Sequence, residues 1–242
     1  MVKGSQRQEK VIAVVPAAGK GKRFGPDTNK PFHPLISNPL IIWSLKALEN
    51  VIDIVEIIPV LKVEDMEHGR NVFEEYGLSK IKRIAPGGKK RQDSVYNGLK
   101  LIENTNCIVL IHDGVRPLIE KPLIEDMIKQ MSEILQKKEQ CDGIVLGVPL
   151  KDTIKVAEDG IIKKTLTRDS LLAIQTPQVF PYSTIFSAYE RAMKEGFYST
   201  DDAAIVERYG GKIKIVMGSY RNIKITTPED LAIAEILLSR RD

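Results

Sequence analysis

The chain has 242 residues, 43% of them hydrophobic and 28% charged, which is ordinary for a globular protein. Lys and Arg outnumber Asp and Glu by only 36 to 32 and are mostly dispersed, which disfavours nucleic acid as a partner, because nucleic-acid-binding proteins usually present a longer basic face. The two cysteines are far apart in the chain and are expected to be reduced core thiols, so with only three histidines a dedicated zinc site is disfavoured. The chain has no secretory segment and no apolar stretch near ~20 residues. We therefore expect a cytoplasmic protein with no membrane contact.

Short apolar runs alternate with longer amphipathic segments in the first part of the chain. The runs predicted as strands span residues 11–15, 54–60, 81–85, 107–111 and 144–148. The segments predicted as helices span residues 40–50, 63–76, 92–103 and 122–137. Because the predicted strands are apolar almost throughout, this order predicts an α/β fold with a parallel sheet that helices cover on both faces.

This alternation stops after Pro149. Two short strand-like runs, 153–156 and 161–166, are joined through Asp159-Gly160, and Asp-Gly between such runs is a strong signal for a β-hairpin. The hairpin is too polar to lie in the core, so we expect it to project as an arm at about residues 150–170. An isolated hairpin of this length is stable only when it packs on something, which makes a partner subunit plausible.

The remaining segment returns to regular elements. Helices are predicted over residues 182–194 and 201–209, strands over 213–217 and 222–225, and a last helix with Thr227 as its N-cap and Pro228 near its start. No repeat, low-complexity linker or shift in composition divides the chain. We therefore expect residues 1–242 to form a single domain that carries the arm.

A glycine-rich, basic loop follows the first predicted strand. It reads Ala-Ala-Gly-Lys-Gly-Lys-Arg-Phe-Gly over residues 17–25, and Lys30 follows. Glycines let the backbone N–H groups approach an anion closely, and the cations supply charge, so a triphosphate is the natural ligand. The spacing matches neither the P-loop nor the dinucleotide fingerprint, which disfavours a nicotinamide-dependent oxidoreductase.

Further polar segments lie where other predicted strands end. They are Pro86-Gly87-Gly88, the segment from His112 to Pro117, and the turn after Val148. In open parallel sheets, ligands bind beyond the carboxyl ends of the strands, so these segments are expected to converge on one site with the glycine-rich loop.

Several side chains in these segments suit phosphate chemistry. Asp113 could ligate Mg²⁺ directly or through water, and Arg116 could clamp a phosphate, although an Asp-Gly turn with an ion pair is the plain alternative. Lys224 interrupts an apolar run and is either such a cation or an exposed residue of a strand. The chain offers cations and a carboxylate but no convincing nucleophile, which favours direct displacement on a bound nucleotide.

Eight motifs occur in an order that carries a family resemblance over residues 11–238. They are Ala17-Ala18-Gly19-x-Gly21-x-Arg23-x-Gly25, Lys30, Pro86-Gly87-Gly88-x-x-Arg91-x-x-Ser94-Val95, His112-Asp113-x-x-Arg116-Pro117, Asp152-Thr153-Ile154-Lys155, Gln175-Thr176-Pro177-Gln178-x-Phe180, Thr200-Asp201-Asp202-Ala203 and Asn222-Ile223-Lys224-Ile225-Thr226-x-Pro228-Glu229-Asp230-Leu231. Together they closely resemble the 2-C-methyl-D-erythritol 4-phosphate cytidylyltransferase family of the non-mevalonate isoprenoid pathway.

The resemblance implies a fold, a reaction and an assembly. The fold would be a Rossmann-like, mostly parallel sheet of the nucleotide-diphospho-sugar transferase type with a projecting β-hairpin arm. The enzyme would transfer CMP from CTP to the methylerythritol phosphate, with Mg²⁺ as cofactor, and release pyrophosphate. It would be a homodimer in which the arm of one copy reaches the site of the other.

The resemblance also implies roles for individual residues. Catalytic cations would be Arg23, Lys30 and Lys224. The nucleotide would be bound by Ala17, Ala18, Gly19, Gly21, Gly88, Ser94 and Asp113. The sugar-alcohol phosphate would be bound by Asp113, Arg116, Thr153, Arg168 and Thr176, with Thr153 and Arg168 acting across the dimer. Asp113 would also be the tentative metal ligand.

Two departures from the family pattern stand close to these residues. The family commonly has Pro-Lys-Gln where this chain has Asn29-Lys30-Pro31, and proline is expected to push Lys30 toward an extended backbone. Lys89 stands where an acid is often seen. Two alternatives remain open at this point: a D-ribitol-5-phosphate cytidylyltransferase, and a non-catalytic nucleotide-binding protein of the same fold.

Overall fold

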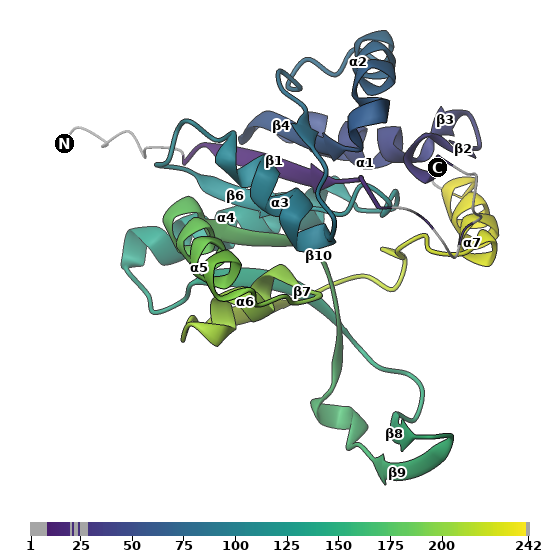
Figure 1. The fold of residues 1–242 in the computed structure, drawn as a ribbon, viewed down its shortest axis with the longest axis vertical. Helices are drawn as coiled ribbons and strands as arrows, with labels where there is room; N and C mark the ends of the chain where they lie inside the picture. The colour runs from purple at the N-terminus through teal and green to yellow at the C-terminus, as the bar shows by residue number, and fades with distance from the viewer. Residues whose placement is uncertain (1–8, 20, 22–23, 25–28, 241–242) are drawn as a thin grey trace.

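The computed structural model describes residues 9–19, 21, 24 and 29–240. Its centre is a seven-stranded sheet with the strand order β11-β7-β10-β6-β1-β4-β5 (Figure 1). The strands are β1 (Val11–Pro16), β4 (Ile54–Leu61), β5 (Ala85–Pro86), β6 (Ile108–Ile111), β7 (Gly143–Pro149), β10 (Leu172–Pro181) and β11 (Ile213–Met217).

The sheet is mostly parallel, as the sequence predicts. β1 runs parallel to β4 and to β6, and β11 runs parallel to β7. β10 is the exception, because it lies antiparallel between β6 and β7. The strand pattern does not predict β10, since two prolines and two glutamines interrupt its apolar residues and its register shifts between Gln175 and Gln178.

Helices cover both faces of the sheet, which confirms the predicted α/β class. One face packs against α1 (Leu40–Glu49), α2 (Met66–Glu75) and α4 (Lys121–Lys137). The other face packs against α3 (Arg91–Lys100), α5 (Tyr182–Glu195) and α6 (Asp202–Arg208). Successive residues of β1 point to opposite cores, which is why this strand is apolar throughout. Among the described residues, no helix combines the length and apolarity that crossing a membrane requires.

A third, smaller core lies at the side of the sheet, where α7 (Pro228–Leu238) packs near the short strands β2 (Pro34–Leu35) and β3 (Asn38–Pro39). The predicted N-cap of α7 is confirmed. Thr227 Oγ1 accepts from the backbone of Asp230 at 3.4 Å, and Oδ2 of Asp230 accepts from the backbone of Thr227 at 2.9 Å, which completes a capping box.

Two predicted strands are wrong or shortened. Residues 222–225 form a loop in place of a strand. The side chain of Arg116 donates to the carbonyl of Asn222 at 2.8 Å, so that carbonyl bonds to a side chain and not to a neighbouring strand, and Ile225 makes a single backbone hydrogen bond, to Val115. Residues 81–85 hold an isolated bridge at Ile81, and the two-residue strand β5 begins only at Ala85.

The predicted arm is present. β8 (Lys155–Glu158) and β9 (Ile161–Thr165) pair antiparallel, and every residue of both strands is exposed. Asp159 and Gly160 have φ angles of 49° and 76°, the left-handed values that a tight hairpin turn between twisted strands requires. The hairpin stands away from the central sheet on two connecting segments (Figure 1).

Candidate active site

A cavity of about 1350 Å³ opens beyond the carboxyl ends of β1 and β6. Its wall includes the backbone at 17–19, the loop 87–90 at the start of α3, and the side chains of Lys30, Asp113 and Lys224. The glycine-rich loop, the loop at 87–90 and Asp113 therefore share one cavity, as a parallel sheet predicts, but the turn after Val148, which was expected to join them, does not line it.

The two glycine-containing loops touch each other at the cavity wall. A Cβ at Gly87 would lie 2.2 Å from the Cβ of Ala18, and a Cβ at Gly88 would lie 2.2 Å from the Cβ of Asp93. Gly87 N also donates to the carbonyl of Leu61 at 2.6 Å, which continues the sheet into the loop. Glycine is required at both positions because no side chain fits between these backbones.

Positive side chains outnumber negative ones in the wall of the cavity. The cations are Lys30, Lys62, Lys89, Lys90, Arg91 and Lys224. The acids are Glu64 and Asp113. Such an excess of one sign in a concave surface attracts a multiply charged anion.

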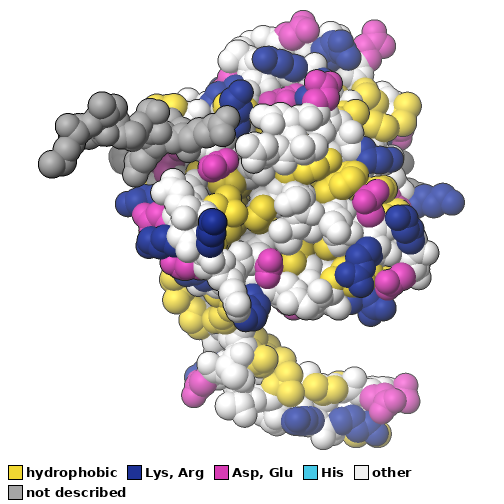
Figure 2. Space-filling view, turned by 90° about the vertical axis from the view of Figure 1, so that its left-hand side faces the viewer, with side chains coloured by type: hydrophobic (Ala, Val, Ile, Leu, Met, Phe, Trp, Pro, Cys, Tyr) yellow, Lys and Arg dark blue, Asp and Glu magenta, His cyan; other side chains and the backbone are white. Residues whose placement is uncertain are grey.

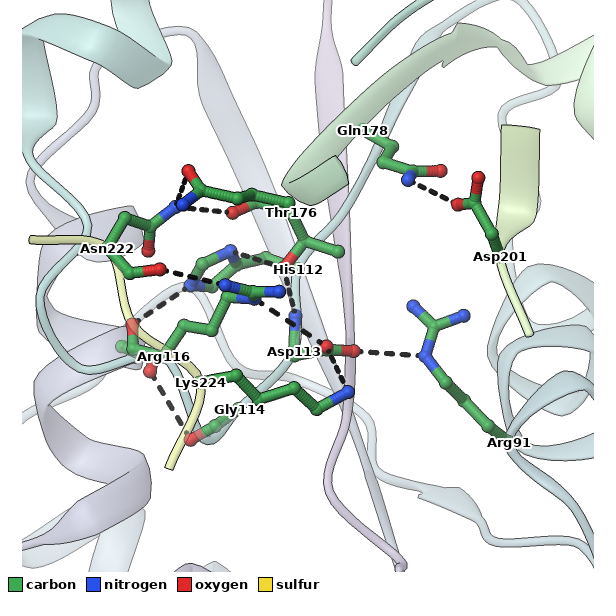
Figure 3. Close-up of polar contacts among 12 residues, drawn as sticks. Arg91, His112, Asp113, Gly114, Arg116, Thr176, Gln178, Asp201, Asn222 and Lys224 are labelled. Carbon is green, nitrogen blue, oxygen red and sulfur yellow. Dashed lines mark hydrogen bonds and ion pairs between the residues drawn. The ribbon is translucent and has the colours of Figure 1, made fainter. Parts of the chain in front are cut away.

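Asp113 is the most heavily contacted acid of the site. Its side chain is 7% exposed; Arg91 Nε lies 3.0 Å from Oδ1, Lys224 Nζ 2.8 Å from Oδ2, and Arg116 Nε 3.8 Å from Oδ2 (Figure 3). Burial by itself raises the pKa of Asp113, but the three cations hold that pKa well below its usual range. The carboxylate is therefore ionised at neutral pH and its orientation is determined from two sides.

A buried chain of hydrogen bonds lies beneath Asp113. Its backbone N–H donates to Thr176 Oγ1 at 3.0 Å, and Thr176 Oγ1 lies 3.2 Å from His112 Nδ1. His112 Nε2 lies 3.3 Å from the carbonyl oxygen of Arg116. Because a carbonyl can only accept, Nε2 carries the proton and Nδ1 accepts from the Thr176 hydroxyl. Burial lowers the pKa of His112 to about 4, which keeps the ring neutral at pH 7.

Arg116 is buried in the same region and does not line the cavity in this structure. It is 8% exposed, and it donates to the carbonyl of Asn222 at 2.8 Å. Asn222 in turn donates to the carbonyl of Thr176 at 2.9 Å. These bonds join the loop of Lys224 to the segment of Asp113 (Figure 3).

Ser94 uses its hydroxyl within the loop at the start of α3. Its Oγ accepts from Gly88 N at 3.0 Å and donates to the carbonyl of Lys90 at 3.2 Å. Both bonds are local, so Ser94 holds the shape of the glycine loop while it lines the cavity.

Lys30 begins the short 3₁₀-helix η1 (Lys30–Phe32), so the predicted extended backbone before Pro31 is wrong. Pro31 takes the second helical position, where a missing N–H removes no hydrogen bond. The segment is anchored from outside: Asn29 Nδ2 donates to Asp65 Oδ1 at 2.8 Å, and Phe32 packs edge-on against His68. These contacts determine the local backbone in place of the pre-proline preference.

The structure brings together most of the residues predicted from the sequence, but not all. The predicted residues that line the cavity are Ala17, Ala18, Gly19, Gly21, Lys30, Gly88, Ser94, Asp113 and Lys224. Arg116 and Thr176 lie directly behind Asp113. Thr153 and Arg168 lie on the exposed arm, and Arg168 donates to the carbonyl of Lys151 at 2.8 Å. Arg23 lies outside the described residues.

Several polar residues of the site were not among the predicted site residues, including Lys62, Glu64, Lys89 and Lys90 in the cavity wall. Arg91 and Asp202 form a bidentate ion pair at 2.8 and 2.7 Å, and Arg91 also contacts Asp113. Both belong to motifs that carry the resemblance, so their place in those motifs was the available signal. Nothing in the spacing along the chain shows that they meet.

Within the described residues, the contacts of Asp113 disfavour a metal ion bound directly by the protein. In the part of the chain that the structure describes, no group of three His, Cys, Asp or Glu residues could hold one. Both oxygens of Asp113 already face cations, so direct ligation would place a divalent ion beside Arg91 and Lys224. The contacts favour a role of Asp113 toward a metal through a bound water over direct ligation.

The sequence model of the 2-C-methyl-D-erythritol 4-phosphate cytidylyltransferase family matches residues 11–240. A relative with that name from Clostridioides difficile (strain 630) is 45% identical over 227 residues, 93% of this chain and 92% of its own. Another from Alkaliphilus oremlandii (strain OhILAs) is 44% identical over 234 residues, 96% of each chain.

Solved structures agree with the sequence comparison. The 4-diphosphocytidyl-2C-methyl-D-erythritol synthase from Anaerococcus prevotii DSM 20548 superposes with a TM-score of 0.82 and 31% identity, covering 96% of this chain and 97% of that one. The 2-C-methyl-D-erythritol 4-phosphate cytidylyltransferase of Francisella tularensis gives a TM-score of 0.78 at 27% identity, covering 94% and 99%. The protein described here belongs to the 2-C-methyl-D-erythritol 4-phosphate cytidylyltransferase family.

Proposed function

We propose that this chain transfers CMP from CTP to 2-C-methyl-D-erythritol 4-phosphate. A phosphate oxygen of the acceptor attacks the α-phosphorus of CTP, the bond from that phosphorus to the β-phosphate oxygen breaks, and pyrophosphate leaves with the electron pair. The products are 4-diphosphocytidyl-2-C-methyl-D-erythritol and pyrophosphate. Family membership supports the reaction, and the observation that carries it is that Lys30 and Lys224 line one cavity with the glycine backbone at 17–19 and 87–88.

The glycine-lined wall is the proposed nucleotide site. Ala17, Ala18, Gly19 and Gly21 would approach CTP through their backbone, and Gly88 and Ser94 would form the opposite wall. A base and ribose would fit against a wall of glycines and small side chains, where backbone groups can contact them closely. The hydrogen bonds of Ser94 to its own loop support a role in shaping that wall.

Lys30 and Lys224 are the proposed catalytic residues of the described part of the chain. Charge accumulates on the oxygens around the α-phosphorus as the new bond forms, and a preorganised ammonium stabilises that charge more than it stabilises bound CTP. The acceptor phosphate is already an anionic nucleophile, so the step needs no general base. Arg23 is proposed as a third cation, on the triphosphate, from the resemblance alone.

Asp113, Arg116 and Thr176 are proposed to bind the acceptor. Asp113 and Arg116 form an ion pair, and the backbone N–H of Asp113 donates to the Thr176 hydroxyl, so the three residues form one preorganised surface behind the cavity. Asp113 would accept a hydrogen bond from a hydroxyl of the sugar alcohol, because its carboxylate is ionised. The Thr176 hydroxyl donates to His112 and its oxygen accepts from the Asp113 N–H, so its second lone pair would be the acceptor for a substrate hydroxyl.

Thr153 and Arg168 are proposed to complete the acceptor site of a second copy. They are exposed on the arm and do not line the cavity of their own chain. Figure 2 shows apolar side chains along the arm, and exposed apolar residues there include Val156, Ile161 and Ile162. Burial of these side chains against a partner would stabilise the arm, which supports a homodimer.

Mg²⁺ is the proposed cofactor, and Asp113 would hold it through a bound water. When bound, it supplies neutralisation of phosphate charge. We further propose that residues 1–242 act as one nucleotidyltransferase domain with an arm at about 150–170, and that the enzyme works in the cytoplasm on a small-molecule substrate.

The test is pyrophosphate release with CTP and Mg²⁺, with methylerythritol 4-phosphate or ribitol 5-phosphate as acceptor. Release with the methylerythritol phosphate alone is expected. Release with ribitol 5-phosphate alone would overturn the substrate while it keeps the mechanism. CTP binding without release from either acceptor would indicate a non-catalytic member of the fold.

A further inference from the structure

Arg91, the first residue of α3, contacts two carboxylates that come from different parts of the chain. Its Nε lies 3.0 Å from Oδ1 of Asp113, which follows β6 (Figure 3). Its two terminal nitrogens lie 2.8 and 2.7 Å from the two oxygens of Asp202, the first residue of α6. A bidentate pair determines the plane of the guanidinium, and with it the direction of Nε.

Asp202 is enclosed in the fold and does not line the cavity. It is 1% exposed, and Oδ1 also accepts a hydrogen bond from the hydroxyl of Tyr189, a fully buried residue of α5. A carboxylate in this position cannot reach a nucleotide or an acceptor. Its contacts leave it one role toward the site, which is to hold Arg91.

The contact of Arg91 with Asp113 decides which oxygen is available to Lys224. Because Nε takes Oδ1, Oδ2 is left for the amine of Lys224, which lies 2.8 Å away. Lys224 belongs to a loop without regular structure, and its side chain is 39% exposed. Its ion pair with Asp113 is therefore the described contact that directs the amine at the cavity.

Asp202 also balances the charge of Arg91. With Asp202 in place, its two oxygens hold both terminal nitrogens of the guanidinium, and Nε is the nitrogen that contacts Asp113. Without that charge, the freed N–H groups would turn toward Asp113, the nearest carboxylate, and would compete with Lys224 for Oδ2.

We propose that Asp202 and Arg91 are positioning residues that fix the Asp113 carboxylate and, through it, the amine of Lys224. The role in catalysis rests on the proposed function of Lys224, but the positioning of the amine does not. The relay runs from the hydroxyl of Tyr189 through Asp202, Arg91 and Asp113 to Lys224.

The test compares Asp202→Asn with Glu56→Gln. The control makes the same carboxylate-to-amide change in another bidentate pair, since Arg83 contacts both oxygens of Glu56 at 2.8 and 2.9 Å outside the cavity. Two quantities are measured on folded protein: the rate at which acetic anhydride modifies Lys224, followed by peptide mass spectrometry, and kcat with KM for CTP. Tyr189→Phe is a milder second variant if Asp202→Asn fails to fold.

Asp202→Asn is expected to change the labelling rate of Lys224 but not that of Lys137, which is exposed on α4. It is also expected to lower kcat about 10- to 100-fold while KM for CTP stays nearly unchanged. Glu56→Gln should do neither. Unchanged labelling of Lys224 would overturn the positioning, and changed labelling with normal kcat would overturn its part in catalysis. If the wild type releases no pyrophosphate, the proposed function fails while the labelling still decides the positioning.

Discussion

The amine of Lys224 lies 2.8 Å from Oδ2 of Asp113, so the lysine proposed to stabilise the transition state is ion-paired before a nucleotide binds. Asp113 is also contacted by Arg91 and Arg116, and its charge is shared among three cations. Asp113 therefore neutralises only part of the positive charge of the Lys224 amine, which can still attract the substrate phosphates, while the ion pair holds the amine in one direction.

Lys224→Ala tests that amine directly. We expect a loss of transition-state stabilisation on the order of 3–4 kcal/mol, with CTP affinity and folding largely kept, because removal of one preorganised charge stabiliser has this effect in other enzymes. The measurement is pyrophosphate release together with calorimetric CTP binding. Lys137→Ala, at an exposed position of α4, is the control, and a Lys224→Ala enzyme with more than about half the wild-type rate would contradict the role.

Gly87→Ala and Gly19→Ala should separate protein packing from nucleotide contact. A Cβ at Gly87 would lie 2.2 Å from the Cβ of Ala18, whereas a Cβ at Gly19 would meet no described atom within 4 Å. Gly87→Ala should therefore lower both the thermal stability of the free protein and CTP affinity. Gly19→Ala should leave free-protein stability unchanged and weaken CTP binding alone, and equal loss of stability in both variants would count against this interpretation.

His112 should make stability depend on pH in weakly acid solution. Its pKa in the fold is about 4, below the ordinary value of 6.5, so the unfolded chain binds a proton more readily between these values. The stabilisation is present above pH 6.5 and is lost as pH falls toward 4, by up to about 3 kcal/mol. Urea unfolding from pH 7.5 to pH 4.5 measures it, and His112→Gln should flatten the slope; identical slopes would exclude His112 as its source.

Asn29→Ala tests how η1 is held. The side chain of Asn29 donates to Asp65 at 2.8 Å. Loss of this hydrogen bond should reduce the free energy that holds the segment of Lys30 in place by about 0.5–1.5 kcal/mol. Because Lys30 follows directly, kcat should fall roughly 2- to 10-fold. Asp65→Ala should give the same loss, and the double variant should add little to it. Asn38→Ala removes a comparable side-chain amide, which donates to the hydroxyl of exposed Ser37 at 3.3 Å, and should have no effect on kcat. Additive losses would mean that the two residues act separately.

Mixing two inactive variants tests whether the arm acts on the partner's site. In a mixed dimer of Lys224→Ala and Arg168→Ala subunits, one site would combine an intact Lys224 with an intact arm from the other copy. Statistical mixing should therefore restore about a quarter of wild-type activity, since half of the dimers are mixed and each has one complete site. An arm that serves its own chain would restore none, and the two variants measured alone set the baseline.

The sequence predicts the elements whose signals are local. The strand β1, the turn at Asp159-Gly160 and the capping box of Thr227 each depend on residues within a few positions of one another. Local backbone preferences and side-chain alternation determine these elements, so they can be predicted from the sequence. The glycine-rich loop belongs to the same class, because only its place after a strand and its residue types are needed.

Other features could not be predicted because distant segments override local preference. β10 is a strand despite its prolines because β6 and β7 offer hydrogen-bond partners on both sides. Residues 222–225 are a loop despite their apolar pattern, because Arg116 takes the carbonyl of Asn222. Lys30 is helical before a proline because contacts from η2 (Val63–Asp65) and α2 hold that segment.

By itself, the sequence determined the α/β class, the arm, the family and the residue types of the site. Only the tertiary structure decided which charges meet: Arg91 pairs with Asp202, which is 111 positions away, and through Asp113 it reaches Lys224. The physical reason is that secondary-structure propensity and hydrophobic periodicity depend on residues within a few positions of one another. The pairing of buried charges depends instead on how the helices pack on the sheet. The direction in which each of the proposed catalytic lysines points is therefore a property of the fold.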